Sequence, residues 1–411
     1  MELLDICKKA RKAAFELSQS SEKRNAALDA ISKQLLKDTD ILLRENEKDI
    51  LNAKNKGVMP AMLDRLRLTK ERIKAISDAV LKVRALPEVL DISQEFTRPC
   101  GLIINKVTVP IGVIGIIYEA RPNVTVDASV LCIKSGNAVI LRGGSEAINS
   151  NLALCRSISE ALESVGLSRE CVQVIDDTSR ETVNKLMKMN GYIDVLIPRG
   201  GAGLIKNVVE NSNIPVIETG AGNCHVYVDK SADLNMALEI IDNAKTQRPS
   251  VCNAAENLLV HADIAAEFLP MVKACLEKKQ VELRGCEETL RFISCNKATP
   301  EDFYTEYNDY ILSIKIVSGV KEAVEHINLH STKHSEAIIT DNFENAEYFT
   351  KAIDSAAVYV NASTRFTDGE EFGFGAEIGI STQKLHARGP MGLQALTTIK
   401  YIVCGNGQIR K

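Results

Sequence analysis

Residues 109–147 read VPIGVIGIIYEARPNVTVDASVLCIKSGNAVILRGGSEA. The apolar runs at 111–118 and 138–141 have the composition of buried strands, and a helical pattern at 126–134 lies between them. Strands that are apolar along their whole length and alternate with helices are typical of a parallel sheet covered by helices on both faces. The segment therefore predicts a doubly wound α/β fold, in which ligands bind beyond the carboxyl ends of the strands.

The same alternation continues along the chain. Further strands are predicted at 172–175, 193–197 and 215–217, with helices at 147–165, 180–189 and 202–210. A second set comprises strands at 257–261, 311–317, 337–340 and 356–360 and helices at 264–278, 321–328 and 345–352. Residues 1–85 read as helix throughout, and the residues after 361 read as a polar, glycine-rich, irregular tail. The two sets predict two α/β lobes.

Composition excludes several classes of protein. The chain has 411 residues, and 50 Lys and Arg against 54 Asp and Glu give a net charge of −4, so it offers no broad positive surface to a nucleic acid. The longest apolar stretch, 107–117, is broken by Pro110 and is too short to cross a bilayer. The N-terminal residues do not resemble a secretory signal, and the 11 cysteines contain no CxxC pair. We therefore expect a soluble cytoplasmic protein with free thiols.

Two glycine-containing loops each follow a predicted strand and open a helix. They are Arg142–Ser145, with Gly143 and Gly144, and Arg199–Gly203, with Gly200 and Gly201. Glycine lets a backbone approach a ligand closely, and the N–H groups at a helix start attract phosphate. Each loop by itself is explained equally well by the geometry of a tight turn. Because both loops are expected at the same edge of the sheet, together they favour a dinucleotide as the ligand.

Three side chains are candidates for a catalytic role, and each also has a structural or solvent-exposed interpretation. Cys252 lies in a polar segment, QRPSVCNAAEN at 247–257, whose arginine and backbone amides favour a thiolate, although an incidental buried cysteine is the commoner case. Asn123 follows a predicted strand and either donates to an oxyanion or caps the next helix. Glu218 is either a general base or a solvated acid.

His330 and His334 have a metal-binding spacing but lack an evident third ligand.

Four segments together resemble the aldehyde dehydrogenase superfamily and, within it, the γ-glutamyl phosphate reductase family. They are 109–147, QRPSVCNAAENLLVH at 247–261, VYVNASTRFTDG at 358–369 and STQKLHARGPMGLQALTT at 381–398. The resemblance covers essentially the whole chain and makes Cys252 the leading candidate nucleophile. It implies NADPH-dependent reduction of L-glutamyl 5-phosphate to L-glutamate 5-semialdehyde with release of phosphate, the second step of proline biosynthesis.

The resemblance also implies a domain plan. Residues 1–225 would form an NADP-binding domain and 226–361 a catalytic domain, and 362–411 would return to the cofactor domain. A small β-extension used in oligomerisation would draw on about 97–110 and 385–411. A homo-oligomer is therefore expected. Glutamate 5-kinase, fused in some relatives, is expected to be a separate chain here and a possible partner.

The roles that the resemblance implies fall on named residues. Cys252 would form a thioester, and the Asn123 amide and the Cys252 backbone N–H would hold the oxyanion. The implied cofactor contacts are Arg142, Gly143, Gly144, Ser145, Arg199, Gly200, Gly201, Glu218 and Glu306. The aromatic-Gly-Pro sequence that usually follows the position of Glu306 is absent. The cations available to the substrate are Arg121, Arg365, Lys384 and Arg388, the last of which could equally pair across a subunit interface.

Two other readings stay open. Glu218 stands at the position of the superfamily's general base, which activates water for hydrolysis; phosphate release makes that water unnecessary, whereas an oxidative aldehyde dehydrogenase would require Glu218. A non-catalytic binding scaffold, perhaps for glutamate 5-kinase, would be expected to lack Cys252 or Asn123, and both are present.

Overall fold

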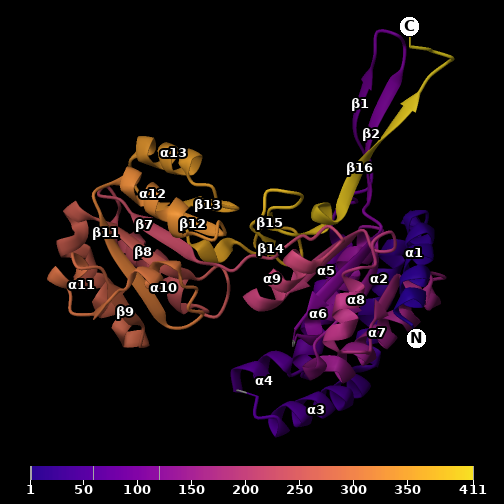
Figure 1. Cartoon of the computed structure of the whole chain (residues 1–411), viewed down its shortest axis with the longest axis horizontal. Coiled ribbons are helices and arrows are strands. Elements are labelled where there is room, and N and C mark those ends of the chain that lie inside the picture. The colour runs from indigo at the N-terminus through magenta and orange to yellow at the C-terminus, as the bar shows by residue number, and fades with distance from the viewer. Residues whose placement is uncertain (1, 59, 120, 411) are drawn as a thin grey trace. The chain divides into compact units, whose positions relative to one another are not determined.

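The computed structural model describes residues 2–58, 60–119 and 121–410. Contacts between residues divide the chain into two compact units: unit 1 is Met1–Thr219, Gly373–Gly379 and Met391–Lys411, and unit 2 is Gly220–Phe372 and Ile380–Pro390. Each unit contains its own parallel sheet, which confirms the predicted α/β fold (Figure 1). Every helix in the described part of the chain is too short or too polar to cross a membrane.

Unit 1 begins with separate helices where the sequence predicts one helical region. They are α1 (Leu3–Ser18), α2 (Ser21–Lys37), α3 (Thr39–Asn55), α4 (Pro60–Leu66) and α5 (Lys70–Ala85). Local signals separate them: Gly57, with φ +70°, follows α3, and the Thr69 side chain caps α5 by accepting from the Arg72 N–H. The buried face of α1 packs against the sheet of unit 1.

The sheet of unit 1 has four parallel strands in the order β5-β4-β3-β6. The strands are β3 (Val113–Tyr118), β4 (Ala138–Arg142), β5 (Val172–Val174) and β6 (Val195–Arg199), and the helices are α6 (Pro122–Lys134), α7 (Ile148–Ser164), α8 (Arg180–Leu186) and α9 (Ala202–Asn211). Helix α6 packs with α5 and α7, whereas Val183 of α8 and Val208 of α9 join α1 in a core cluster. The chain order reverses between β3 and β6, and ligands of doubly wound sheets bind at such a position.

The predicted strand at 215–217 is wrong. This segment lies beside β6 and makes only an isolated bridge, between Val216 and Leu196. The Leu196 N–H donates to the Pro215 carbonyl, and the Ile217 N–H donates to the Leu196 carbonyl. Proline lacks the N–H that would extend the ladder, so the pairing stops after one residue.

A separate antiparallel sheet in unit 1 is built from β1 (Ile92–Thr97), β2 (Ile103–Pro110) and β16 (Thr397–Cys404), in the order β1-β2-β16. It forms an extended ribbon that we call the β-arm (Figure 1). The prediction of a small β-extension is confirmed. The expectation that the chain after residue 361 is irregular is wrong for β16, which is a regular strand. Pairing with β2 along eight residue pairs orders a segment whose own sequence is only partly apolar.

Unit 2 contains a seven-stranded parallel sheet in the order β10-β9-β11-β8-β7-β12-β13. Its strands are β7 (Cys224–Val228), β8 (Ala255–His261), β9 (Glu282–Gly285), β10 (Asn296–Lys297), β11 (Ile311–Val317), β12 (Ser335–Ile339) and β13 (Ala357–Val360). Its helices are α10 (Leu234–Thr246), α11 (Ala265–Leu276), α12 (Val320–His330) and α13 (Phe343–Ala352), and a short pair, β14 (Ile380–Ser381) and β15 (Gly389–Pro390), completes the unit. The sequence pattern missed β7, because Cys224 and His225 interrupt its apolar character although the whole strand is buried.

Candidate active site

Cys252 lies in the turn between α10 and β8, where it is partly exposed. The next residue, Asn253, is buried, and its side-chain amide donates to the carbonyls of Arg365, at 3.2 Å, and Thr367, at 2.9 Å. The Thr364 hydroxyl donates to the Asn253 carbonyl at 2.7 Å. These contacts join the 363–367 segment to the turn, so the backbone beside the thiol is fixed from a position more than a hundred residues away.

Gly222 constrains the same turn from its other side. A Cβ atom added at Gly222 would lie 1.5 Å from the Cys252 carbonyl oxygen and 2.6 Å from its Cα, so only glycine fits. The Gly222 N–H donates to Oε1 of Glu306 at 2.7 Å. Glu306, a predicted cofactor ligand, thus has one carboxylate oxygen engaged in holding the segment that backs Cys252.

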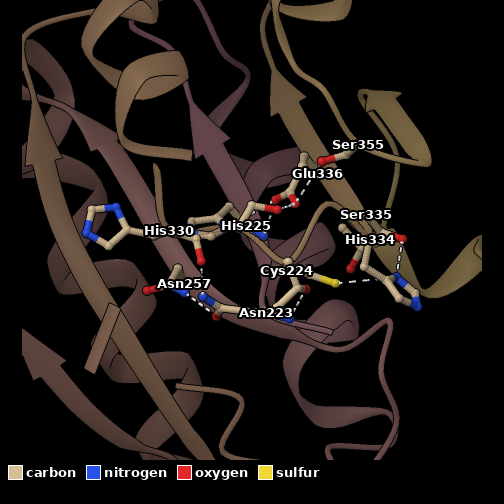
Figure 2. Close-up of polar contacts among 12 residues, drawn as sticks. Asn223, Cys224, His225, Asn257, His330, His334, Ser335, Glu336 and Ser355 are labelled. Atoms are coloured by element: carbon tan, nitrogen blue, oxygen red, sulfur yellow. Dashed lines mark hydrogen bonds and ion pairs between the residues drawn. The ribbon is translucent and has the colours of Figure 1, made fainter. Parts of the chain in front are cut away.

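The residues after Gly222 are held by buried polar side chains on neighbouring strands. The Cys224 thiol donates to the Cys252 carbonyl at 3.1 Å and lies 3.8 Å from Nδ1 of His334. The His225 backbone N–H and its Nδ1 lie 2.7 and 3.1 Å from Oε2 of the fully buried Glu336. Figure 2 shows Cys224 beside His334, and Glu336 beside His225. The start of β7 is therefore rigidly placed against the nucleophile turn.

Asn223 adds a further set of contacts to this segment. Its side-chain amide donates to the carbonyls of Phe303, at 2.8 Å, and His330, at 3.0 Å. Its oxygen accepts from Nδ2 of Asn257, at 2.7 Å. Asn223 and Asn257 lie together in the polar cluster of Figure 2. Asn223 lies between Gly222 and Cys224, which both contact the Cys252 backbone, and neither Asn223 nor Asn257 was singled out by its sequence context.

The other buried thiols differ from Cys252 in their surroundings. Burial raises the pKa of the Cys7 thiol to about 11 and that of Cys171 to about 12, and it raises the pKa of Cys132 and Cys224 further. A raised pKa keeps a thiol protonated and unreactive at neutral pH. Cys252 instead lies partly exposed in the turn that precedes β8.

The four predicted substrate cations occupy different environments. Arg365 donates through Nε to Gln247 at 2.8 Å and through Nη1 to the Asn253 side chain, and burial followed by the charge of Arg248 lowers its pKa. Lys384 and Arg388 instead lie 2.9 and 3.0 Å from the two carboxylate oxygens of Asp354. Arg365 is thus the predicted cation that the structure brings to the Cys252 turn. Arg121 is exposed at the start of α6.

Lys333 also pairs with Asp354, at 3.1 Å. Hydrogen bonds from Lys384, Lys333 and Arg388 lower the pKa of Asp354 far below its usual range. One carboxylate therefore faces three cations, all within unit 2. Arg388 therefore has an ion-pair partner within its own chain, and the alternative of a pair across a subunit interface stays a prediction.

In unit 1, Asn123 lies within the first turn of α6. The N-cap position belongs to Arg121, so the expectation that Asn123 caps the helix is wrong. The Asn123 side chain is exposed, and its Nδ2 donates to Oδ2 of Asp127, one turn along, at 3.0 Å. This contact orients the amide and leaves its second N–H available to a ligand.

The loop after β4 is filled by protein rather than left open. A Cβ atom at Gly143 would lie 2.2 Å from Nδ2 of Asn151, and Arg142 donates to the carbonyls of Thr178 and Ser179. Ser145 is exposed and begins a short 3₁₀ turn that precedes α7. The start of α7 does not offer free N–H groups as expected: the Asp49 carboxylate accepts from the Asn149 and Ser150 N–H groups at 3.2 and 2.8 Å. A side chain already occupies this favourable anion position.

The loop after β6 is more open. Among the described residues, no neighbouring side chain or loop lies within 4 Å of a Cβ placed on Gly201 or Gly203, whereas a Cβ on Gly200 would lie 2.6 Å from Glu119. The Gly201 N–H donates to Oε2 of Glu119 at 3.0 Å. Nε of Arg199 is buried and has no hydrogen-bond partner among the described residues. Glu218 lies partly buried just before the chain enters unit 2.

His330 and His334 do not face one another as paired ligands. His330 Nδ1 contacts the His326 carbonyl at 2.8 Å, and its ring stacks on that of His326 with 3.9 Å between centroids. His334 is buried and lies 2.8 Å from the Ser335 hydroxyl. The His330 ring therefore packs on its own helix, whereas His334 lies beside Cys224 at the start of β7.

Sequence comparison places these features in a known family. The sequence profile of the aldehyde dehydrogenase family matches residues 2–289. The chain is 60% identical over 411 residues to γ-glutamyl phosphate reductase of Petrotoga mobilis, covering 99% of each sequence. It is 59% identical over 412 residues to γ-glutamyl phosphate reductase of Clostridium perfringens SM101, covering 100% of this chain and 99% of that one.

Solved structures agree with this assignment. The crystal structure of γ-glutamyl phosphate reductase from Thermotoga maritima matches with a TM-score of 0.98 at 48% identity, covering 100% of both chains. The Saccharomyces cerevisiae enzyme of the same name matches at 29% identity with a TM-score of 0.55, covering 99% of this chain and 98% of that one. The chain belongs to the γ-glutamyl phosphate reductase family within the aldehyde dehydrogenases.

Proposed function

We propose that this chain is the NADPH-dependent reductase that converts L-glutamyl 5-phosphate to L-glutamate 5-semialdehyde and phosphate, the second step of proline biosynthesis. The observation that carries the proposal is the Cys252 turn, in a chain similar over its whole length to γ-glutamyl phosphate reductases. Gly222, Asn253 and Cys224 hold the backbone of this turn from three sides and leave the thiol partly exposed.

The thiol chemistry follows from the substrate. An acyl phosphate is already activated, so the Cys252 thiolate attacks its carbonyl carbon, a C–S bond forms, and the C–O bond to phosphate breaks. The tetrahedral species carries an oxyanion, to which the Asn123 amide and the Cys252 backbone N–H donate. Loss of one such donor raises a barrier by about 3 kcal/mol. Collapse of the later thiohemiacetal releases the aldehyde and returns the thiolate.

NADPH, when bound, supplies the hydride that reduces the thioester. The feature of the loop after β6 that supports an anionic cofactor is the buried Arg199 Nε, which has no partner among the described residues, whereas the Gly201 N–H already donates to Glu119. We assign Arg199, Gly200 and Gly201 to the pyrophosphate. The remaining predicted contacts, Arg142, Gly143, Gly144, Ser145, Glu218 and Glu306, stay predictions.

The finer assignments belong to the same proposal. Unit 1 is proposed to bind the cofactor and unit 2 to carry the nucleophile, and the bounds of these units replace those at 225 and 361 that the resemblance implied. Arg121, Arg365, Lys384 and Arg388 are proposed for the substrate's anionic groups, with Arg365 favoured by its place at the Cys252 turn. The enzyme is proposed to act in the cytoplasm, in keeping with 11 cysteines that form no disulfide, as a homo-oligomer with glutamate 5-kinase as a possible partner.

The test of the reaction uses the reverse direction, since an acyl phosphate is labile. Reduced-cofactor absorbance is followed with glutamate 5-semialdehyde and NADP, with and without phosphate. The wild type should require phosphate, and Cys252→Ala should lose at least about 10³-fold in turnover because the nucleophile is gone. Cys275→Ala, which removes another partly exposed thiol of unit 2, is the control and should retain activity. Turnover that survives in Cys252→Ala would overturn the assignment.

Glu218 separates this reaction from hydrolytic oxidation of an aldehyde. Phosphate is the leaving group, so no water needs activation, and Glu218→Gln should keep phosphate-dependent turnover within about tenfold of the wild type. The same assay measures it. Phosphate-independent production of glutamate that disappears in Glu218→Gln would instead identify an oxidative aldehyde dehydrogenase.

A further inference from the structure

Asp127 is a carboxylate at the ligand-binding edge of unit 1 that the mechanism above does not use. It lies on α6, the helix that leaves β3, and β3 neighbours β6 where the strand order reverses. Helix α6 packs with α5 and α7, whereas the helix after β6 packs into the cluster with α1. Doubly wound sheets bind their ligands at such a reversal.

The carboxylate has an unused hydrogen-bonding oxygen. Oδ2 accepts from Nδ2 of Asn123 at 3.0 Å, and no described residue donates to Oδ1. The flanking Val126 and Ala128 are fully buried, while Asp127 itself is partly exposed and so accessible to a small ligand. Burial raises the pKa of Asp127 to about 6, and the Asn123 hydrogen bond and the Arg199 charge act against that rise. At neutral pH the group is an ionised, poorly solvated carboxylate, which gains from contact with a cation.

Among the described residues, no cation is hydrogen-bonded to Asp127. Arg199 is near enough for its charge to favour the ionised form, yet it makes no hydrogen bond to Asp127 in the described structure. A Cβ atom on Gly379 would lie 2.6 Å from Arg199 Nη1, so this guanidinium packs on the 379 backbone. The carboxylate is therefore poised for a cation that comes with a ligand.

The substrate of the proposed reaction carries such a cation at a matching distance. Its α-ammonium nitrogen is four bonds from the reacting carbonyl carbon, each about 1.5 Å long. The Asn123 amide nitrogen, the proposed oxyanion donor, lies 3.0 Å from Oδ2 of Asp127, which is less than the span of four such bonds. A carbonyl oxygen on the Asn123 amide thus leaves the amino end of the same molecule within reach of Asp127.

We propose that Asp127 binds the α-ammonium group of the substrate and selects an α-amino acid derivative over the same acyl chain without the amine. This inference rests on the proposed function for the identity of the substrate. Asp127 also accepts a hydrogen bond from Asn123, so the experiment must distinguish binding of the ammonium group from a role in orienting Asn123 alone.

The experiment compares two aldehydes in the reverse assay with NADP and phosphate: L-glutamate 5-semialdehyde and 5-oxopentanoate, which has the same chain but no amine. Asp127→Asn keeps a side-chain oxygen for the Asn123 N–H and removes the charge. We expect kcat/KM for the amino substrate to fall about 10- to 100-fold, mainly through KM, because a hydrogen bond to a charged group is lost. The value for 5-oxopentanoate should stay within about threefold.

Asp78→Asn is the matched control, since it removes a surface carboxylate of α5 that pairs with Lys74 at 2.7 Å. It should leave both substrates unchanged. Asp127→Glu restores the charge on a longer side chain and should recover part of the preference. An equal fall in kcat for both aldehydes in Asp127→Asn would overturn the proposal and assign Asp127 to the orientation of Asn123.

Direct binding separates this inference from the proposed function. Calorimetry with L-glutamate and glutarate, which differ by the amine, needs no turnover. The wild type should bind L-glutamate more tightly, and Asp127→Asn should abolish that preference. A wild type that lacks phosphate-dependent turnover but keeps this preference would contradict the proposed reaction and still support Asp127 as an ammonium site. Equal binding of both ligands by the wild type would overturn it.

Discussion

Gly222 is the residue that the backbone of the nucleophile constrains most directly. It has no recognisable catalytic group, yet the space beside its Cα is filled by the Cys252 backbone. Gly203, on α9, is the opposite case, because in the part of the chain that the structure describes nothing beyond its own helix lies within 4 Å of a Cβ placed there. Glycine is therefore required at position 222, where the Cys252 backbone lies against it, whereas a larger side chain fits at position 203.

We expect Gly222→Ala to move the nucleophile turn and lower kcat/KM about 10- to 100-fold or more, since small displacements of a reacting group are costly. Gly203→Ala should keep activity and raise the free energy of unfolding by up to about 1 kcal/mol, because alanine is the better helix former. Steady-state kinetics and thermal melting measure the two effects. Full activity in Gly222→Ala would show that the turn is not held as described.

At the scale of the element, α12 buries histidines against the sheet of unit 2. His326 stacks on His330 and makes edge contacts with His225, at 5.9 Å, and Phe303, at 5.2 Å between centroids. Burial, together with the charges of His225 and His330, lowers the pKa of His326 to about 2. The folded helix thus keeps this imidazole neutral well below pH 6.

Burial of His326 should make the stability of the protein sensitive to acid. Below pH 6.5 the unfolded chain binds a proton at His326 that the folded chain excludes, so the free energy of unfolding falls as pH falls, by about 1.4 kcal/mol per pH unit. His326→Gln should lack this contribution. Urea unfolding at pH 7.5 and 5.5 should show a loss about 1.4 kcal/mol smaller in the variant than in the wild type.

Comparison with the variant is needed because another buried group acts in the opposite direction. Burial raises the pKa of Glu256 to about 7, so the folded state takes up a proton there as pH falls, which favours folding. Glu256 is present in both proteins, and its contribution cancels in the difference. Equal pH dependence in the two proteins would show that His326 is not buried in its neutral form.

At the scale of the whole molecule, the β-arm leaves apolar side chains in solvent. Tyr401 is 57% exposed and Val403 54% exposed, and β1 at the edge of the sheet is exposed throughout. Exposed apolar strands with an open edge are typical of surfaces that pair with another chain. The arm is the surface by which we expect copies of the chain to associate.

Charged residues on the arm should therefore weaken assembly. We expect the double variant Tyr401→Lys and Val403→Lys to sediment as a smaller species than the wild type, because burial of two ammonium groups in an interface is unfavourable. Leu51→Lys, on α3, is the control at a position of similar exposure, 51%, and should leave the sedimentation coefficient unchanged. An unaltered coefficient in the double variant would place the interface elsewhere.

Much of the fold could be predicted from local pattern. The predicted strand at 311–317 matches β11 in full, and the helix at 202–210 matches α9 to one residue, because both have strong, regular apolar periodicity. The central strand β7 was missed, since Cys224 and His225 acquire their buried partners only from other strands. The β-arm strand at 397–404 likewise depends on its pairing with β2.

The sequence by itself determined the two α/β lobes, the family and the candidate thiol, because runs of apolar residues and long motifs are local properties of a chain. Only the tertiary structure decided that Asp49 occupies the start of α7, that Arg388 and Lys384 share Asp354, and that Asp127 holds the Asn123 amide with one oxygen to spare. The physical reason is that such contacts depend on which distant side chains fill the same few ångströms. Residue spacing does not specify that distance until the chain is packed.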